Sequence, residues 1–366
     1  METRVWRHFD PFLLLATICL VAFGLAMIHS ATYETSGAGI DPLVYHQAGY
    51  AIGGFLLFVV LSGLDYHVLS NFVWPLYGAC CFMLVLVLAA GRILHGSQRW
   101  IQAGPIQFEP SQAATLCVIL ALAKYFSNPV ENPKSPRFVL GSLLIPAIPM
   151  VLVLMQPDFG TATIYAAIWL GALFAAGVPL FYFGALFGIV AACAPAAWLV
   201  MHAYQRQRIL IFLHPQSDPL NTGYNAIQAL ISIGSGGLLG RGYLSGSQSQ
   251  LHFLRVQYAD FIFSVLAEEL GFVGAVALLA LFLIIFWRGL RAARLSRETF
   301  GRLLACGIVA CFFYQVVVNV GMNVGLLPVT GIPLPMISYG GSSLVTFMAA
   351  LGILESIVMR HRKLEF

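Results

Sequence analysis

Three acidic residues within ten positions form the part of this chain best suited to chemistry. Asp260 stands directly before an apolar run, and Glu268 and Glu269 lie inside that run. Charges at membrane depth are costly and usually serve a function. A carboxylate that is partly shielded from water holds its proton more tightly and becomes a better base near neutral pH. Asp260 is therefore the first candidate for a general base; the alternative is that it caps the following helix.

Glu268 and Glu269 lie too far along the same helix to reach a substrate held at Asp260. At about 1.5 Å per residue, they are roughly 12 to 14 Å away from it. We expect hydrogen-bonded packing contacts with polar residues of other helices, such as Gln315 or Asn319. The alternative is that both acids tune a cavity.

The composition is that of a membrane protein. Hydrophobic residues make up 59% of the 366 residues and charged residues only 9%, far from the average of a soluble domain. Ten apolar runs are long enough to cross roughly 30 Å of hydrocarbon as helices. We therefore expect an all-α polytopic membrane protein that forms a single domain over residues 1–366. The ten predicted spans are 11–29, 46–63, 72–90, 111–127, 138–155, 160–178, 181–201, 261–287, 303–323 and 339–359.

The distribution of Lys and Arg predicts the orientation. With the N-terminus in the cytoplasm, 13 of these residues fall inside and six outside, as the positive-inside rule requires. Both termini are then cytoplasmic, and residues 91–110, 202–260 and 324–338 lie on the outer face. The large outer loop 202–260 is too long for a plain connection, and we expect it to carry amphipathic helices, including one at 224–233. No basic patch indicates nucleic acid.

Cysteines and histidines give no sign of a protein metal cage. All seven cysteines lie in apolar runs without a Cys-x-x-Cys pair, and the nine histidines are scattered, so both read as structural residues. A divalent cation, Mg²⁺ or Mn²⁺, is the expected cofactor, held mostly by phosphate oxygens of a substrate.

Several arginines lie on the predicted outer face against the general trend. Guanidinium groups bind phosphate oxygens in a fork-shaped geometry, so these residues are candidates for binding a diphosphate. The alternative is attraction to anionic lipid headgroups. We rank Arg99 and Arg241 first, and the others are Arg206, Arg208 and Arg255.

Three further outer segments each leave two interpretations open. The glycine run 234–242, which contains Gly236, is either a plain turn or a turn that holds an anion. Asp158 either caps the helix that follows it or faces a cavity. The small residues between Ser338 and Ser342 allow close approach of helices or of a lipid tail. Trp100 fits the aromatic belt at a membrane boundary.

Long motifs in this chain resemble those of the SEDS family (shape, elongation, division and sporulation). Asn319 is followed by GLLPVTGIPLPMISYGGSS at 325–343, which looks like the family signature. The motifs at 99–100, 110–111, 156–161, 233–237, 260–263 and 268–271 also fall in family order. The resemblance covers nearly the whole chain and favours the elongation branch, RodA, over the division branch, FtsW.

The resemblance implies a peptidoglycan glycosyltransferase of the bacterial inner membrane that polymerises lipid II. Its implied partners are a class B penicillin-binding transpeptidase and other membrane proteins of the elongation complex. Asp260 matches the essential outer-loop aspartate of the family. The expected substrate-binding residues are Arg99, Trp100, Gln156, Asp158, Arg206, Arg208, Gly236, Arg241, Ser338 and Ser342.

The chain departs from the family pattern in two places. Gln112 and Thr115 stand where many members have the Glu and Lys of Pro-Ser-Glu-x-x-Lys. The acid and the base are lost together, as expected if the two residues form an ion pair in those members. Residues 255–259 read Arg-Val-Gln-Tyr-Ala instead of Pro-Glu-Arg-His-Thr, which puts the role of a neighbouring histidine in doubt.

Three functions fit these observations. In the first, Asp260 activates the 4-hydroxyl of an acceptor sugar, which displaces undecaprenyl diphosphate with inversion. The second is a flippase or transporter of lipid-linked cell-wall precursor, and the third is a non-enzymatic scaffold of the elongation machinery. A flippase depends on charges near the bilayer midplane, and the Glu and Lys of the fourth predicted span are missing. Asp260, the acid on the outer face, remains, so the glycosyltransferase is favoured.

Overall fold

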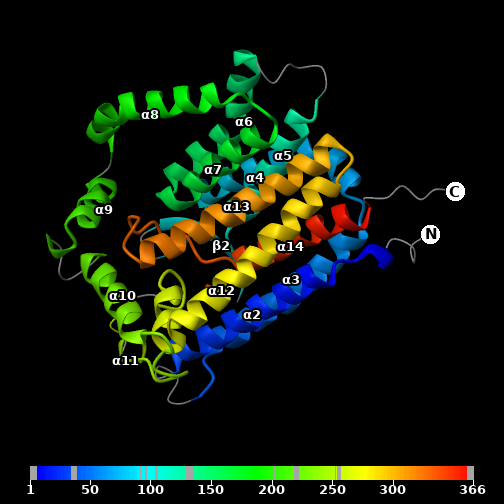
Figure 1. Ribbon diagram of the computed structural model, residues 1–366. Coiled ribbons are helices and arrows are strands. Elements are labelled where there is room, and N and C mark those ends of the chain that lie inside the picture. Colours follow the sequence, from blue (N-terminus) through cyan, green and yellow to red (C-terminus); the bar gives the residue numbers. More distant parts are fainter. Residues whose placement is uncertain are drawn as a thin grey trace.

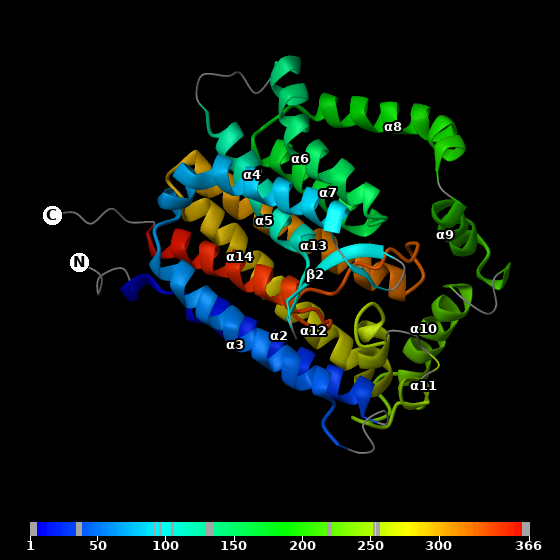
Figure 2. The same ribbon diagram turned by 180° about the vertical axis from the view of Figure 1, so that it is seen from behind.

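The protein is described by a computed structural model over residues 6–33, 39–90, 92–94, 97–103, 106–128, 135–201, 203–217, 222–251, 253 and 257–360. Long helices form a bundle that carries a small sheet and several short helices at one end (Figure 1). Both termini lie at the opposite end (Figures 1 and 2). We call the end with the sheet, α10 (Thr222–Gly236) and α11 (Ser247–Gln250) the loop end, and the other the terminal end.

Helices of the described chain coincide with all ten predicted apolar runs. Seven are long and apolar enough to cross a membrane, and α5, α7 and α8 are shorter apolar helices. The prediction of a helical polytopic membrane protein is therefore confirmed. The ten helices are α2 (Pro11–Thr32), α3 (Pro42–Gly63), α4 (Tyr66–Ala90), α5 (Pro110–Phe126), α6 (Pro136–Met155), α7 (Phe159–Ala175), α8 (Leu180–Val200), α12 (Ile262–Leu295), α13 (Thr299–Asn323) and α14 (Gly341–Met359).

Local signals explain where several helices begin. The Asp10 carboxylate accepts hydrogen bonds from the amides of Phe12 and Leu13, and Asp41 caps α3 in the same way. Asp10 also forms a buried ion pair with Arg288 of α12. A side-chain cap satisfies amides that have no partner within the helix, and here it also joins α2 to α12 at the terminal end.

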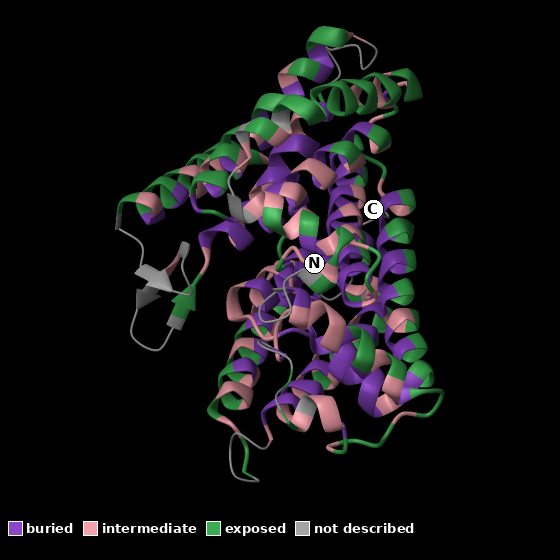
Figure 3. Ribbon diagram, turned by 90° about the vertical axis from the view of Figure 1, so that its left-hand side faces the viewer, coloured by how far each residue is buried: buried purple, intermediate pink, exposed green. Residues whose placement is uncertain are grey.

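The exterior of the bundle is apolar. Figure 3 shows buried residues gathered inside the bundle and exposed residues on its outer faces. α8 runs apart from the other helices (Figures 1 and 2) and exposes large apolar side chains such as Phe181 and Phe187. Apolar surface of this extent is stable against lipid or another membrane protein, but not against water.

The segment 91–110 contains a sheet that the all-α prediction did not include. β1 (Arg92–Leu94), β2 (Ser97–Ala103) and β3 (Ile106–Phe108) pair antiparallel in the order β1-β2-β3. The signal was present, because Gly96 and the Gly104-Pro105 pair separate three short runs, as in consecutive hairpins. β2 carries Arg99 and Trp100 at the loop end.

The described part of the loop 202–260 is largely helical, as expected. It contains α9 (Ala203–Leu213), the 3₁₀ turn η3 (Pro215–Ser217), α10 (Thr222–Gly236) and α11 (Ser247–Gln250). α10 includes the predicted amphipathic helix: Ala229 and Ser232 are buried, whereas Leu230 and Ile231 are exposed.

Near its start, α12 is interrupted by one glycine whose backbone is not helical. Gly271 has φ 65° and ψ −163°. The amides that follow it bond to the loop instead of to their own helix: Phe272 N donates to Gly237 O (2.9 Å) and Val273 N to Leu238 O (3.1 Å). The loop therefore supplies the acceptors that the broken helix lacks.

The glycine run approaches α12 more closely than any side chain would allow. A Cβ on Gly236 would lie 1.9 Å from Ala267 O, and one on Gly240 would lie 2.1 Å from Glu269 O. The amide of Gly242 donates to Glu269 O at 2.9 Å. These contacts place Gly236 against the backbone of α12. Whether the run also holds an anion stays a prediction.

We predict that Gly271→Ala destabilises the protein. This backbone region is essentially reserved for glycine, a strained residue costs about 1 to 3 kcal/mol, and the new Cβ would lie 2.3 Å from Gly240 N. The thermal midpoint of the detergent-solubilised protein should fall by several degrees. Gly78→Ala in α4, where nothing lies within 4 Å of the new Cβ, is the matched control. Equal midpoints for the two variants would contradict the prediction.

Candidate active site

The backbone of Asp260 is held at the loop end by two buried asparagines of α13. The Nδ2 atoms of Asn319 and Asn323 donate to the carbonyl oxygen of Asp260 at 3.2 and 3.1 Å, and Ser264 Oγ donates to Asn323 Oδ1 at 2.6 Å. The capping alternative for Asp260 is wrong, because the N-cap of α12 is Phe261 and makes no side-chain hydrogen bond. The Asp260 carboxylate therefore does not serve as the cap of α12.

The segment before α14 holds the two residues that precede Asp260, Tyr258 and Ala259. Ser338 Oγ donates to Ala259 O (2.6 Å) and accepts from Leu334 N (2.8 Å), and Tyr339 N donates to Tyr258 O (2.9 Å). The hydroxyl of Ser338, expected at the substrate, is thus used to position the backbone beside Asp260.

The Asp260 carboxylate is partly buried among charged groups. A Cβ on Gly331 would lie 3.8 Å from its Oδ2. Burial is the largest influence and raises the pKa of Asp260 to about 6, while Arg208 and Arg99 lower it and Asp158 raises it. A carboxylate with this pKa is ionised at neutral pH and is a stronger base than an exposed aspartate.

Arg99 is the cation that joins the sheet to α7. Its Nη1 lies 3.5 Å from Asp158 Oδ2, and it donates to the carbonyl oxygens of Pro157 (2.5 Å) and Gln156 (3.4 Å). The Asp158 carboxylate also accepts from the amide of Thr161 at 3.1 Å. The capping interpretation of Asp158 is confirmed. Asp158 also lies beside Arg99, and its contact with a cavity stays a prediction.

Arg208 is the second cation near Asp260. It lies on α9, and its Nη1 donates to Thr330 O at 3.2 Å. The charge of Arg208 lowers the pKa of Asp260 more than the charge of Arg99 does. The structure thus brings together Asp260, Arg99 and Arg208 from three segments far apart in the chain.

Two other predicted arginines make contacts elsewhere. Arg206 Nη2 donates to Leu199 O (2.7 Å), and Arg241 Nη1 donates to Ser247 Oγ (2.8 Å). Neither arginine is among the charges that shift the pKa of Asp260. Arg255 lies outside the described residues.

The remaining predicted residues contact neighbouring backbone. Gln156 is buried and donates to Leu84 O at 3.0 Å. Ser342 Oγ accepts from Glu109 N at 2.9 Å. Trp100 pairs with Arg92 across the sheet. Their contact with a substrate stays a prediction.

Glu268 and Glu269 bind the loop and α2. Glu268 Oε1 accepts from a backbone amide of α11 at 2.8 Å, and Glu269 Oε1 accepts from Ser30 Oγ at 2.5 Å. The expectation of hydrogen-bonded packing is confirmed, but the suggested partners Gln315 and Asn319 are wrong. The loop packs against this stretch of α12, which the sequence pattern did not show.

One acid of the site, Glu109, was missed by the sequence analysis. It directly precedes α5, and Ser111 Oγ donates to its Oε1 at 3.0 Å. Burial and then the charge of Asp158 raise the pKa of Glu109 to about 7, against a lowering by Arg99. Its only sequence signal was a lone acid directly before an apolar run.

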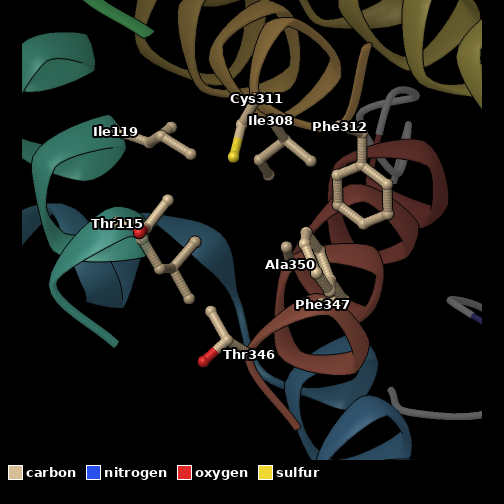
Figure 4. A pocket seen from close by; sticks show the side chains of 9 residues that line it. Thr115, Ile119, Ile308, Cys311, Phe312, Thr346, Phe347 and Ala350 are labelled. Atoms are coloured by element: carbon tan, nitrogen blue, oxygen red, sulfur yellow. The ribbon is translucent and has the colours of Figure 1, made fainter. Parts of the chain in front are cut away.

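A small apolar pocket lies between α5, α13 and α14, away from these charges. Figure 4 shows side chains from the three helices meeting around it, including Thr115, Cys311 and Phe347. Thr115 stands where many SEDS members have Lys. A lysine here would face apolar side chains, in keeping with the loss of both charges at once.

No ready-made metal cage is found among the described residues. Within them, no three or more His, Cys, Asp or Glu side chains are grouped to hold an ion. A divalent cation at this site would need most of its oxygen ligands from a bound substrate.

Comparison with known proteins identifies the family. The family model for FtsW, RodA and SpoVE, described as cell cycle protein, matches residues 11–363. The chain belongs to this family. The resemblance to SEDS proteins is thereby confirmed, and it extends over the whole membrane bundle.

Members of the family are similar to this chain over almost their full length. Peptidoglycan glycosyltransferase MrdB of Escherichia coli strain K12 is 42% identical over 358 residues, covering 98% of this chain and 95% of MrdB. Peptidoglycan glycosyltransferase RodA of Treponema pallidum strain Nichols is 33% identical, covering 99% and 100%.

Solved structures of family members share the fold. Rod shape determining protein RodA of Thermus thermophilus has a TM-score of 0.71 and 32% identity, covering 98% of each chain. A chain from a structure described as "Structural coordination of polymerization and crosslinking by a peptidoglycan synthase complex" has a TM-score of 0.84 and 34% identity, covering 96% of this chain and 98% of that one.

We predict that Arg208→Gln raises the pKa of Asp260 above about 6, because it removes the charge that lowers this pKa most. Infrared difference spectroscopy can follow the carboxylic acid band of Asp260, which Asp260→Asn identifies by its loss. Arg241→Gln is the matched control and should leave the midpoint unchanged. An unchanged midpoint in Arg208→Gln would contradict the electrostatic account.

Proposed function

We propose that this protein is a peptidoglycan glycosyltransferase that polymerises lipid II on the outer side of the bacterial inner membrane. One observation carries the proposal: the partly buried Asp260 carboxylate lies near Arg99 and Arg208 at one end of a membrane bundle, with no side-chain hydrogen bond or ion pair among the described residues. The curated relatives bear the name peptidoglycan glycosyltransferase. The site offers a base and charge compensation, which this transfer requires.

In the proposed reaction, Asp260 takes the proton of the 4-hydroxyl of the acceptor's N-acetylglucosamine. The oxygen attacks the anomeric carbon of the donor's N-acetylmuramic acid, and the bond from that carbon to the diphosphate breaks. Undecaprenyl diphosphate leaves with the electron pair, and the proton stays on Asp260 until solvent removes it. A single displacement inverts the anomeric configuration and needs only one base.

Charge compensation for the leaving diphosphate falls to Arg99 and Arg208. Guanidinium groups aimed at the position where negative charge develops lower the barrier most where water is scarce. A divalent cation, Mg²⁺ or Mn²⁺, held mainly by the diphosphate oxygens, would add to this compensation when bound.

We further propose ten membrane spans with both termini in the cytoplasm. Lys124 contacts Ser70, Arg288 contacts Asp10, and Arg360 contacts residues at the end of α3. These cations gather at the terminal end, opposite Asp260, as the positive-inside rule requires. The Asp260 site then faces the outside.

A crosslinking enzyme is the proposed partner. One similar chain comes from a peptidoglycan synthase complex that coordinates polymerization and crosslinking. We therefore expect this protein to act beside a class B penicillin-binding transpeptidase and other membrane proteins of cell elongation.

We predict that Asp260→Asn abolishes glycan polymerisation. Loss of a positioned general base lowers the rate by about 10²- to 10⁴-fold. Purified protein is incubated with lipid II and Mg²⁺ in detergent, and glycan strands are resolved on gels. Asp65→Asn, at the terminal end of the bundle, is the matched control and should polymerise normally. Polymer from Asp260→Asn at the wild-type rate would refute the enzyme and favour a transporter or scaffold.

The pH dependence of kcat/KM should show an acid limb. Asp260 acts as a base only when ionised, so kcat/KM should rise through about pH 6 and fall about tenfold for each pH unit below it. Initial rates of polymerisation across a pH series measure this limb. A limb near the ordinary pKa of aspartate, about 3.9, would contradict the burial of Asp260.

A further inference from the structure

Glu109 occupies a capping position but does not cap. It is the N-cap residue of α5 and makes no side-chain hydrogen bond to the helix amides. An acid at this position usually accepts from those amides. Here the hydroxyl of Ser111 donates to its Oε1 at 3.0 Å. The carboxylate therefore serves something other than the start of α5.

The surroundings of Glu109 are those of the proposed active site. Its backbone amide is tied to Ser342 Oγ at 2.9 Å. The charged groups that act on its carboxylate are Asp158, at the head of α7, and Arg99, on β2. The buried Tyr165 Oη, on α7, donates to Ser111 O at 2.8 Å, so the head of α5, which follows Glu109, is joined to the helix that Asp158 caps.

A charge count shows why one acid of this site should carry a proton. With Asp260, Asp158 and Glu109 all ionised, Arg99 and Arg208 leave a formal charge of −3 + 2 = −1. A site of net negative charge repels a diphosphate. One bound proton makes the site neutral.

Asp260 and Asp158 are poor candidates for that proton. Asp260 has to be ionised to act as a base. The Asp158 carboxylate already accepts from the Thr161 amide and hydroxyl, at 3.1 and 2.8 Å, and pairs with Arg99 at 3.5 Å. Glu109 has hydrogen bonds from the Ser111 hydroxyl and the Gln112 side chain, and no guanidinium within ion-pair distance among the described residues.

We propose that Glu109 is a positioning residue that acts through Arg99. When protonated, it leaves the guanidinium of Arg99 free for the diphosphate of the lipid substrate. When ionised, it competes for that guanidinium and weakens substrate binding. This inference rests on the proposed function of the site and adds a control of substrate affinity by pH. With the pKa of Glu109 raised to about 7, the change falls near neutral pH.

The test measures binding without catalysis. Fluorescently labelled lipid II is titrated against full-length Asp260→Asn protein in detergent, from about pH 6 to about pH 8. The two phosphates of a diester diphosphate are already ionised over this range. We expect affinity to fall on the order of 3- to 10-fold as pH rises, the effect of one added charge near a partly shielded arginine. In Asp260→Asn/Glu109→Gln, affinity should stay high and independent of pH.

Three controls make the outcome decisive. Glu298 is an exposed acid at the terminal end, and Glu298→Gln added to Asp260→Asn should preserve the fall in affinity. Glu109→Asp in the same background keeps a titrating acid and should preserve the fall with a shifted midpoint. With Asp260 intact, Glu109→Gln should remove the rise of KM at alkaline pH. Equal pH dependence with and without Glu109→Gln overturns the Glu109 inference alone. Absence of lipid II binding at every pH, in wild type as well, overturns the proposed function with it.

Discussion

The site depends on the two amide groups that Asn319 and Asn323 present to the carbonyl oxygen of Asp260. Both asparagines are fully buried, and a buried amide without a partner costs about 1 to 3 kcal/mol. Asn319 also donates to Ile332 O at 2.8 Å, so the same group fixes the segment before α14. α13 therefore acts as the rigid element against which the base and the loop facing it are aligned.

Charge is the second constraint on this site. Asp260 combines a raised pKa with two nearby cations, so it is basic enough to take a proton and still ionised at neutral pH. Asp158 ties Arg99 to the head of α7 and keeps one cation in place. Glu109 gives the cluster a third acid. The balance among these groups suits a diphosphate substrate only when the acids do not outnumber the arginines.

The break in α12 links the site to the large loop. α12 begins just after Asp260, and at Gly271 its backbone bonds pass to the glycine run of the loop. The glycine run therefore packs directly on the first turns of α12, the helix that begins just after Asp260. Glu268 and Glu269 strengthen this junction through α11 and Ser30.

The sequence by itself determined the helical membrane class, the position of each apolar helix, the amphipathic helix in the loop and Asp260 as the candidate base. Each of these follows from local composition, spacing or motif, because a bilayer requires long apolar helices and penalises stray charges. Only the tertiary structure decided which arginines face Asp260, where Glu268 and Glu269 bind, and that Glu109 joins the site. Those properties depend on distances between segments far apart in the chain, and hydropathy carries no information about such distances.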